Sequence, residues 1–329
     1  NVIKALKKYN GKLIEFPHSK GISSTALSKY EIEQGIQPES RLKNLRKALS
    51  VKKLVRIIET HSPISGIIAE KANQNVNGKV NYFDGFWSSS LTDASLKGKP
   101  DIEALNISER LENINNIFEV TSRPLIMDID TGGKVEHLKL NIKSLERLGV
   151  SAVIMEDKTG LKKNSLHKNT SNQKQDSVKN FSSKIRAIKS VQLNNEFMII
   201  ARVESLILGK SLNDALNRAK NYVKAGADGI MIHSKKKTPK EIFDFARKFR
   251  KEFKDIPLVC VPSSYNNVKE SELEKKGFNI VIYANHLFRA AYPSMVNAAN
   301  SILKNERSKE IDNKLATIKE MLDLIPGTK

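Results

Sequence analysis

The segment MEDKTGLKKNSL, residues 155–166, brings carboxylate, ammonium and amide side chains together where the chain leaves an apolar run. Two acidic residues, Glu156 and Asp157, follow residues 152–155, a short run typical of a buried parallel strand. Lysines, a glycine, an asparagine and a serine come next, a composition that favours a mobile flap. The carboxylates at the end of the apolar run are suited to bind a metal, and the lysines of the flap are suited to bind a phosphorylated anion. The alternative is a solvated strand-to-helix loop.

Polar side chains also follow the other apolar runs of the chain. In order they are Glu59, His61, Trp87, Ser88, Ser89, Ser90, Asp128, Asp130, Arg202, Glu204, His233, Ser234, Ser263 and Ser264. Four carboxylates on two neighbouring strands suit Mg²⁺, which prefers oxygen ligands and keeps several waters. They are Asp128, Asp130, Glu156 and Asp157. Arg202 and His233 supply positive charge for phosphate or carboxylate oxygens, although a histidine alone is more often structural.

Eight apolar segments alternate with helical patterns from about residue 51 onward. The strand candidates are 54–59, 83–87, 124–128, 152–155, 197–203, 229–232, 257–261 and 279–283. Helical patterns include 64–73, 138–148, 212–225, 239–251 and 268–276, with Gly149, Gly226 and Gly277 where helix C-caps are expected. Such alternation over about 250 residues indicates a (β/α)₈ TIM-type barrel rather than an open doubly wound sheet. Because the carboxyl ends of barrel strands face one mouth, we expect the polar residues to meet there.

The two ends of the chain differ from this alternating region. We expect a short helical N-terminal segment over 1–50, a barrel domain over 51–305 and a polar C-terminal tail over 306–329. The last barrel helix, 286–305, is apolar on several sides, as if it packs on a neighbour. A short helix is expected over 315–325.

The stretch Gly21-Ile22-Ser23-Ser24-Thr25 can cap a helix with hydroxyls and exposed amides. It resembles the ISSTxxR-type motif near the end of cytidylyltransferase-like nucleotide-binding domains. That resemblance implies the tail of such a domain, without catalysis of its own, because the HxGH signature is absent from the sequence. The alternative is a helical linker that includes residues 40–49.

The composition is that of a globular protein, with 39% hydrophobic and 28% charged residues. No apolar run approaches the roughly 20 residues of a membrane span, and the single cysteine, Cys260, lies in an apolar run. We therefore expect a cytoplasmic protein with no membrane partner. The net charge of +20 is spread along the chain, and aromatic residues make up only 6%, so no nucleic-acid partner is expected.

Several motifs together resemble phosphoenolpyruvate mutase, of the isocitrate lyase/phosphoenolpyruvate mutase superfamily. The flap signature EDK-x5-NS is complete between Glu156 and Ser165. FDGFWSSSLTD, MDIDTGG, ARVES and IMIHS are similar to further strand ends of that family. Two departures, Gly133-Lys134 for Tyr-Gly and the polar stretch LTDASLKGKPD, affect details of the loop wall.

The resemblance implies a role for each matching residue. Asp128 would ligate Mg²⁺ directly, and Asp130, Glu156 and Asp157 would hold its waters. Trp87, Ser89 and the backbone at Leu91 would bind the pyruvyl carboxylate. The catalytic set would be Asp101 facing phosphorus, Lys162, Asn164 and Ser165 on the flap, and Arg202 and His233 on the phosphoryl oxygens. Asp101 would act either as a nucleophile or as a group that orients a metaphosphate-like species.

The resemblance implies Mg²⁺-dependent interconversion of phosphoenolpyruvate and phosphonopyruvate, the carbon–phosphorus bond-forming step of phosphonate biosynthesis. The nearest alternative is phosphonopyruvate hydrolysis, against which Asn164 argues. A carbon–carbon lyase of the isocitrate lyase type would use a flap cysteine, whereas the only cysteine lies in the seventh strand candidate. A basic binding protein without catalysis would leave the carboxylates unexplained. Because members of this superfamily exchange their final helix between subunits, a homodimer or homotetramer is expected.

Overall fold

The computed structural model describes residues 37–167 and 173–325, and its centre is a closed barrel of eight parallel strands. Around the barrel the strands follow the order β1-β12-β11-β10-β9-β6-β5-β4. Their bounds are β1 Val55–Glu59, β4 Gly85–Ser88, β5 Leu125–Asp128, β6 Ala152–Glu156, β9 Met198–Val203, β10 Gly229–Ile232, β11 Leu258–Cys260 and β12 Ile280–Tyr283. All eight predicted strands are present, and the predicted (β/α)₈ fold is confirmed.

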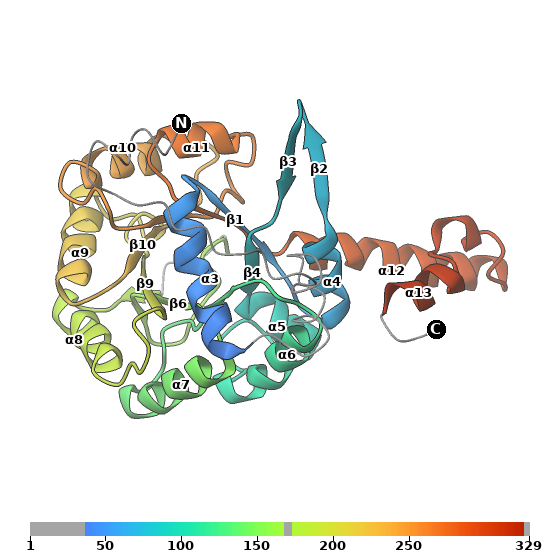
Figure 1. Ribbon diagram of the computed structural model, residues 1–329, viewed down its shortest axis with the longest axis horizontal. Coiled ribbons are helices and arrows are strands. Elements are labelled where there is room, and N and C mark those ends of the chain that lie inside the picture. The colour runs from blue at the N-terminus through green and yellow to red at the C-terminus, as the bar shows by residue number, and fades with distance from the viewer. Residues whose placement is uncertain (1–36, 168–172, 326–329) are drawn as a thin grey trace, which may run out of the picture.

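Helices connect the strands and form the outer layer of the barrel (Figure 1). They are α4 Pro63–Lys71, α5 Ser90–Leu96, α6 Ile107–Glu119, α7 Val135–Leu148, α8 Val178–Lys189, α9 Leu212–Lys224, α10 Lys240–Phe249 and α11 Glu270–Lys275. Gly149 ends α7 with φ of 97°, a left-handed conformation that glycine adopts without a Cβ clash. The position of this C-cap is therefore readable from the sequence.

The helix α3, Pro38–Val51, lies across one open end of the barrel (Figure 1). Its Leu45 is fully buried and belongs to the same core cluster as Ile57, Met198 and Ile280. Met198 and Ile280 are the first residues of β9 and β12. This end is therefore closed by packing, and the opposite mouth is left for polar side chains. The predicted division at residue 50 falls at the end of this helix. The stretch Gly21–Thr25 lies outside the described residues.

A two-stranded hairpin, β2 Asn73–Val76 and β3 Lys79–Tyr82, projects from the barrel beside α4 (Figure 1). The sequence patterns did not predict it, although Asn77-Gly78 at its tip is a strong hairpin signal. Both residues have positive φ, 52° and 77°, as the tight turn requires. A second pair of short strands, β7 Lys158–Thr159 and β8 Lys174–Gln175, lies within the connection from β6 to α8.

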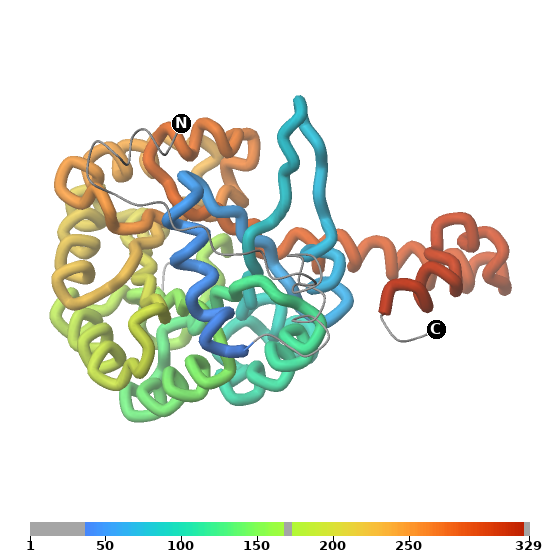
Figure 2. Tube along the Cα trace, in the orientation of Figure 1, coloured from blue at the N-terminus to red at the C-terminus, as the bar shows by residue number. Residues whose placement is uncertain are grey.

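The helix α12, His286–Asn305, extends away from the barrel and has no buried residue (Figures 1 and 2). A short 3₁₀ helix, η1 Asp312–Lys314, and α13, Ile318–Leu324, follow it. Within the described part of the chain, none of the helices combines the length and apolar character needed to cross a membrane.

Candidate active site at the carboxyl end of the barrel

A cavity of about 80 Å³ lies at the mouth formed by the carboxyl ends of the strands. Ten of the thirteen predicted site residues line it, namely Trp87, Ser89, Leu91, Asp101, Asp128, Lys162, Asn164, Ser165, Arg202 and His233. The other three, Asp130, Glu156 and Asp157, are buried behind its lining. The barrel thus brings together residues that are up to 146 positions apart in the sequence (Trp87 to His233, 233 − 87).

Asp128, the last residue of β5, is 5% exposed and its carboxylate is held from two sides. Its Oδ2 accepts a hydrogen bond from Ser90 Oγ at 3.0 Å, and its Oδ1 accepts one from the backbone N–H of Asp130 at 3.0 Å. Burial alone would raise the pKa of Asp128, but the charges of Lys162, Arg202 and other cations hold it below its ordinary value. Asp128 therefore stays ionised and correctly placed to bind a cation.

The ammonium group of Lys162, a flap residue that is 4% exposed, lies among acidic side chains. It donates to Asp101 Oδ1 at 2.7 Å and to Ser90 Oγ at 2.9 Å, and it forms an ion pair with Asp130. Burial and the nearby Asp128 carboxylate raise the pKa of Asp130, and Lys162 opposes that rise. The flap lysine therefore supplies positive charge to the acidic part of the mouth.

Asn164 reaches the same carboxylate from further along the flap. Its Nδ2 donates to Asp101 Oδ2 at 2.8 Å, so the flap bonds both oxygens of Asp101. The Asp101 side chain is only 8% exposed in this arrangement. The flap is therefore closed over the carboxylate that was predicted to face phosphorus.

Ser165, the last residue of the flap signature, joins three charged side chains through one hydroxyl. Its Oγ accepts from Lys158 Nζ at 2.6 Å and from Arg202 Nη2 at 2.7 Å, and it donates to Glu204 Oε2 at 2.5 Å. Sequence reasoning placed Lys158 in the signature and Glu204 at a strand end without giving either a role. The side chains of Lys158 and Glu204 are both fully buried beside the flap, and it is this burial, seen only in the structure, that marks them as part of the site.

His233 and Trp87 present unpartnered nitrogens at the cavity. Arg202 Nη2 lies 3.2 Å from His233 Nδ1, and because arginine can only donate, Nδ1 accepts. Burial, reinforced by the charge of Arg202, lowers the pKa of His233, although Glu204 Oε1, 3.5 Å from Nδ1, opposes the shift. The imidazole is therefore neutral and does not supply the positive charge expected from the sequence; with Nδ1 accepting from Arg202, its proton is on Nε2. Neither His233 Nε2 nor Trp87 Nε1 has a hydrogen-bond partner among the described residues. Both are donors available to an anion.

Glu156, at the end of β6, has one occupied and one unoccupied oxygen. Its Oε2 lies 3.4 Å from Lys158 Nζ and 3.3 Å from Arg202 Nη2, whereas Oε1 is buried without a partner among the described residues. Burial raises the pKa of Glu156 to about 7, although Arg202 and Lys158 oppose the rise. Glu156 Oε1 is therefore a buried acidic oxygen of the mouth that no described donor satisfies.

The carboxylate of Asp157, the residue after β6, accepts hydrogen bonds from the segment after β9, from β8 and from α9. Its Oδ1 accepts from the backbone N–H of Glu204 at 2.9 Å. Its Oδ2 accepts from Tyr222 Oη at 2.7 Å, Gln175 Nε2 at 2.8 Å and Arg218 Nη1 at 3.2 Å. Sequence reasoning did not identify Arg218 or Tyr222 of α9. A role for Asp157 in holding metal-bound water stays a prediction.

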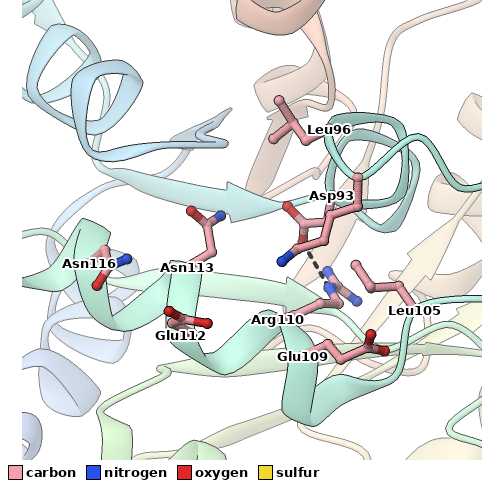
Figure 3. Close-up of a pocket in the computed structure, with 9 residues that line it drawn as sticks. Asp93, Leu96, Leu105, Glu109, Arg110, Glu112, Asn113 and Asn116 are labelled. Carbon is pink, nitrogen blue, oxygen red and sulfur yellow. Dashed lines mark hydrogen bonds and ion pairs between the residues drawn. The ribbon is translucent and has the colours of Figure 1, made fainter.

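Arg110 of α6 bonds residues at the ends of two neighbouring strands, and Figure 3 shows its ion pair with Asp93. Its Nε donates to Asp93 Oδ2 at 2.7 Å and its Nη2 to Ser88 Oγ at 2.8 Å, while Nη1 bonds the backbone oxygen of Asp128. A second cavity, of about 480 Å³, lies between α5 and α6 on the far side of this Asp93–Arg110 pair (Figure 3). Arg110 therefore ties the ends of β4 and β5 together.

The acidic residues fit Mg²⁺ if most of its ligands are water. Within residues 37–167 and 173–325, no three His, Cys, Asp or Glu side chains are grouped to ligate one metal ion. Mg²⁺ commonly keeps several waters and binds one or two carboxylates directly. An ionised Asp128 and the unpartnered oxygen of Glu156 match that requirement.

An eight-stranded parallel barrel with acidic and basic side chains gathered under a flap at its carboxyl mouth is the arrangement of a TIM-barrel enzyme. The sequence model of the phosphoenolpyruvate phosphomutase family matches residues 45–303, and the chain belongs to this family. The resemblance inferred from the sequence motifs is thereby confirmed.

Characterised relatives include enzymes with two different reactions. Phosphonopyruvate hydrolase from Variovorax sp. (strain Pal2) is 35% identical over 284 residues, covering 85% of this chain and 93% of the relative. Phosphoenolpyruvate phosphomutase from Tetrahymena pyriformis is 34% identical over 287 residues, covering 87% and 90%. A crystal structure of phosphonopyruvate hydrolase with oxalate and Mg²⁺ superimposes with a TM-score of 0.76 at 33% identity, covering 87% of this chain and 94% of that one. Overall identity therefore does not separate the two reactions.

We predict that Arg110→Met lowers the free energy of unfolding by roughly 3–5 kcal/mol, because it leaves the buried Asp93 carboxylate without its cation. Urea unfolding followed by circular dichroism measures the change. Arg247→Met is the matched control, because Arg247 is 65% exposed in its ion pair with Asp244 and should change stability by less than about 1 kcal/mol. Equal stabilities of the two variants would contradict the supporting role of Arg110.

Proposed function

We propose that the protein is a phosphoenolpyruvate phosphomutase that interconverts phosphoenolpyruvate and phosphonopyruvate with Mg²⁺, as in phosphonate biosynthesis. The observation that carries the proposal is the closed flap, in which Lys162 and Asn164 bond both oxygens of Asp101. A phosphoryl group transferred within one pyruvate must not meet water, and a closed flap excludes it.

Asp128 would hold Mg²⁺ directly, and Asp130, Glu156 and Asp157 would act through its waters. When bound, Mg²⁺ supplies a Lewis acid that stabilises the negative charge of the pyruvate enolate. The related hydrolase crystallised with oxalate and Mg²⁺ supports this assignment, because oxalate resembles that enolate in charge and shape.

The substrate carboxylate would lie against Trp87, Ser89 and the backbone at Leu91, where β4 passes into α5. Trp87 Nε1 has no partner among the described residues and can donate to a carboxylate oxygen. This end of the cavity holds the part of the substrate that does not react, and so fixes the position of carbon 3.

The phosphoryl oxygens would be bound by Arg202, His233 and Asn164. A loose transition state spreads negative charge over those three oxygens, so donors fixed in advance stabilise it most. Arg202 is held by Glu204 and Ser165, at 2.6 Å and 2.7 Å, so the position of its guanidinium group is set before substrate binds.

In the forward direction the bond from phosphorus to the enol oxygen breaks and a bond from phosphorus to carbon 3 forms. The electron pair of the broken bond stays on the pyruvate enolate, whose carbon 3 then attacks phosphorus. Asp101 either receives the phosphoryl group as an aspartyl phosphate in between or orients a metaphosphate-like species. Both roles require the carboxylate where Lys162 and Asn164 hold it.

Three alternatives have less support. Hydrolysis of phosphonopyruvate needs a water beside phosphorus, and the flap closed over Asp101 restricts the access of that water. A carbon–carbon lyase with a catalytic cysteine has no candidate, because Cys260 is fully buried on β11 and burial raises the pKa of its thiol. A basic binding protein would not need the buried ionic groups of the mouth.

We predict that the protein with MgCl₂ converts phosphonopyruvate into phosphoenolpyruvate, because the flap protects the transferring group from water. Phosphorus NMR resolves the phosphonate, the enol phosphate and inorganic phosphate in one sample. Pyruvate and inorganic phosphate as the only products would replace the mutase assignment with the hydrolase assignment.

We predict that Asp101→Ala reduces turnover at least about 100-fold, since the carboxylate nearest phosphorus is lost, while Mg²⁺ still binds. Steady-state kinetics measures turnover, and calorimetric titration with MgCl₂ measures binding. Glu112→Gln removes an exposed carboxylate of α6 and serves as the control with parental activity. Retained turnover in Asp101→Ala would mean that another group faces phosphorus.

We also propose a homodimer or homotetramer that is assembled through α12. Tyr292, Met295, Val296 and Leu303 form an exposed apolar face of this helix at spacings of three, one and seven residues. We predict that Met295→Glu lowers the oligomer mass measured by sedimentation, whereas Ser294→Glu, on the opposite face, does not. A monomeric parent protein would refute the proposal.

A further inference from the structure

Ser90 is a buried residue of the cavity that is not among the proposed metal-binding, substrate-binding or catalytic residues. It is the first residue of α5, follows β4 directly and is 7% exposed. The N-cap of this helix is Ser89, whose Oγ accepts from the backbone N–H of Thr92. The hydroxyl of Ser90 therefore does not stabilise its own helix, and its contacts lie elsewhere.

Both contacts of the Ser90 hydroxyl cross the mouth. Its single proton is donated to Asp128 Oδ2 at 3.0 Å, and its oxygen accepts from Lys162 Nζ at 2.9 Å. Ser90 thus stands between the carboxylate proposed to hold Mg²⁺ directly and the ammonium group of the flap. The Ser90 hydroxyl therefore connects Asp128 at the end of β5 to Lys162 of the flap.

The geometry around Lys162 makes this connection specific. An ammonium group has three protons, and the three acceptors of Lys162 are Asp101, Asp130 and Ser90. Asp101 and Asp130 are carboxylates of the mouth, and the third acceptor is the neutral Ser90 hydroxyl, which itself donates to Asp128. Opening of the flap would remove the donor to the Ser90 oxygen and would thereby alter the hydrogen bond from Ser90 to Asp128.

We infer that Ser90 is a positioning residue that links flap closure to the orientation of Asp128, an inference that rests on the proposed metal site. Its O–H fixes one oxygen of the Asp128 carboxylate, as the backbone N–H of Asp130 fixes the other. Mutation of groups that orient a metal ligand in this way typically costs roughly 10–100-fold in metal affinity or activity. Ser90 transmits the position of the flap to the metal carboxylate.

The test is calorimetric titration of the protein with MgCl₂ in the absence of substrate. Ser90→Ala should weaken Mg²⁺ binding roughly tenfold or more, because Asp128 loses the donor that orients it. Ser90→Thr keeps the hydroxyl and should recover most of the affinity. Ser95→Ala, which removes an exposed hydroxyl from the same helix, should bind Mg²⁺ like the parent.

A double-mutant cycle tests the link to the flap. Ser90→Ala and Lys162→Met should be non-additive in Mg²⁺ affinity by roughly threefold or more, because the two groups share a hydrogen bond. Lys163→Met is the matched control on the next flap residue, and its effect should add to that of Ser90→Ala. Fluorescence of Trp87, the single tryptophan, gives an independent reading of the same titrations.

Parental Mg²⁺ affinity in a Ser90→Ala protein that unfolds at the parental temperature would overturn the inference, and so would an additive cycle with Lys162→Met. Neither measurement depends on which products the enzyme forms. Hydrolysis instead of transfer would refute the proposed function and leave the role of Ser90 intact.

Discussion

The balance of buried charge at the barrel mouth is the constraint on which the rest of the structure depends. Arg202 Nε lies 2.6 Å from Glu204 and Arg202 Nη2 lies 3.3 Å from Glu156, while Lys158 lies 3.0 Å and 3.4 Å from the same two carboxylates. Burial penalises both anions. The nearer cations hold the pKa of Glu204 well below its ordinary value, whereas burial raises that of Glu156 to about 7. The nearer cations therefore favour the ionised form of Glu204 more strongly than that of Glu156.

The barrel provides these positions through its rigid strand ends. Parallel pairing aligns Asp128 with Ile154 and Glu156 with Arg202, so charged residues of adjacent strands emerge side by side. The closed end under α3 and the support from Arg110 behind β4 and β5 leave the strand ends little freedom. A flap residue that meets this mouth finds its acceptors already in place, which reduces the entropy lost on closure.

The sequence was sufficient for the barrel and for most of the mouth, because buried parallel strands read as continuous apolar runs with polar residues at their ends. The same reasoning could not orient Asp157, since Arg218 and Tyr222 approach it from a helix about sixty residues further along the chain. Nor could it find Arg110, whose burial depends on how α6 packs against β4 and β5. Contacts of this kind are set by tertiary packing and leave no local pattern.

Relatives of 35% and 34% identity are a phosphonopyruvate hydrolase and a phosphoenolpyruvate phosphomutase, so the two reactions occur on chains of similar sequence. A tenfold change in the partition between the two corresponds to about 1.4 kcal/mol. Hydrogen bonds to a charged group contribute roughly 1.5–3 kcal/mol each, and the flap makes two of them to Asp101. Those two bonds together favour the closed flap over an open one. For the proposed mutase, Lys162 and Asn164 would therefore influence the product through the stability of the closed flap.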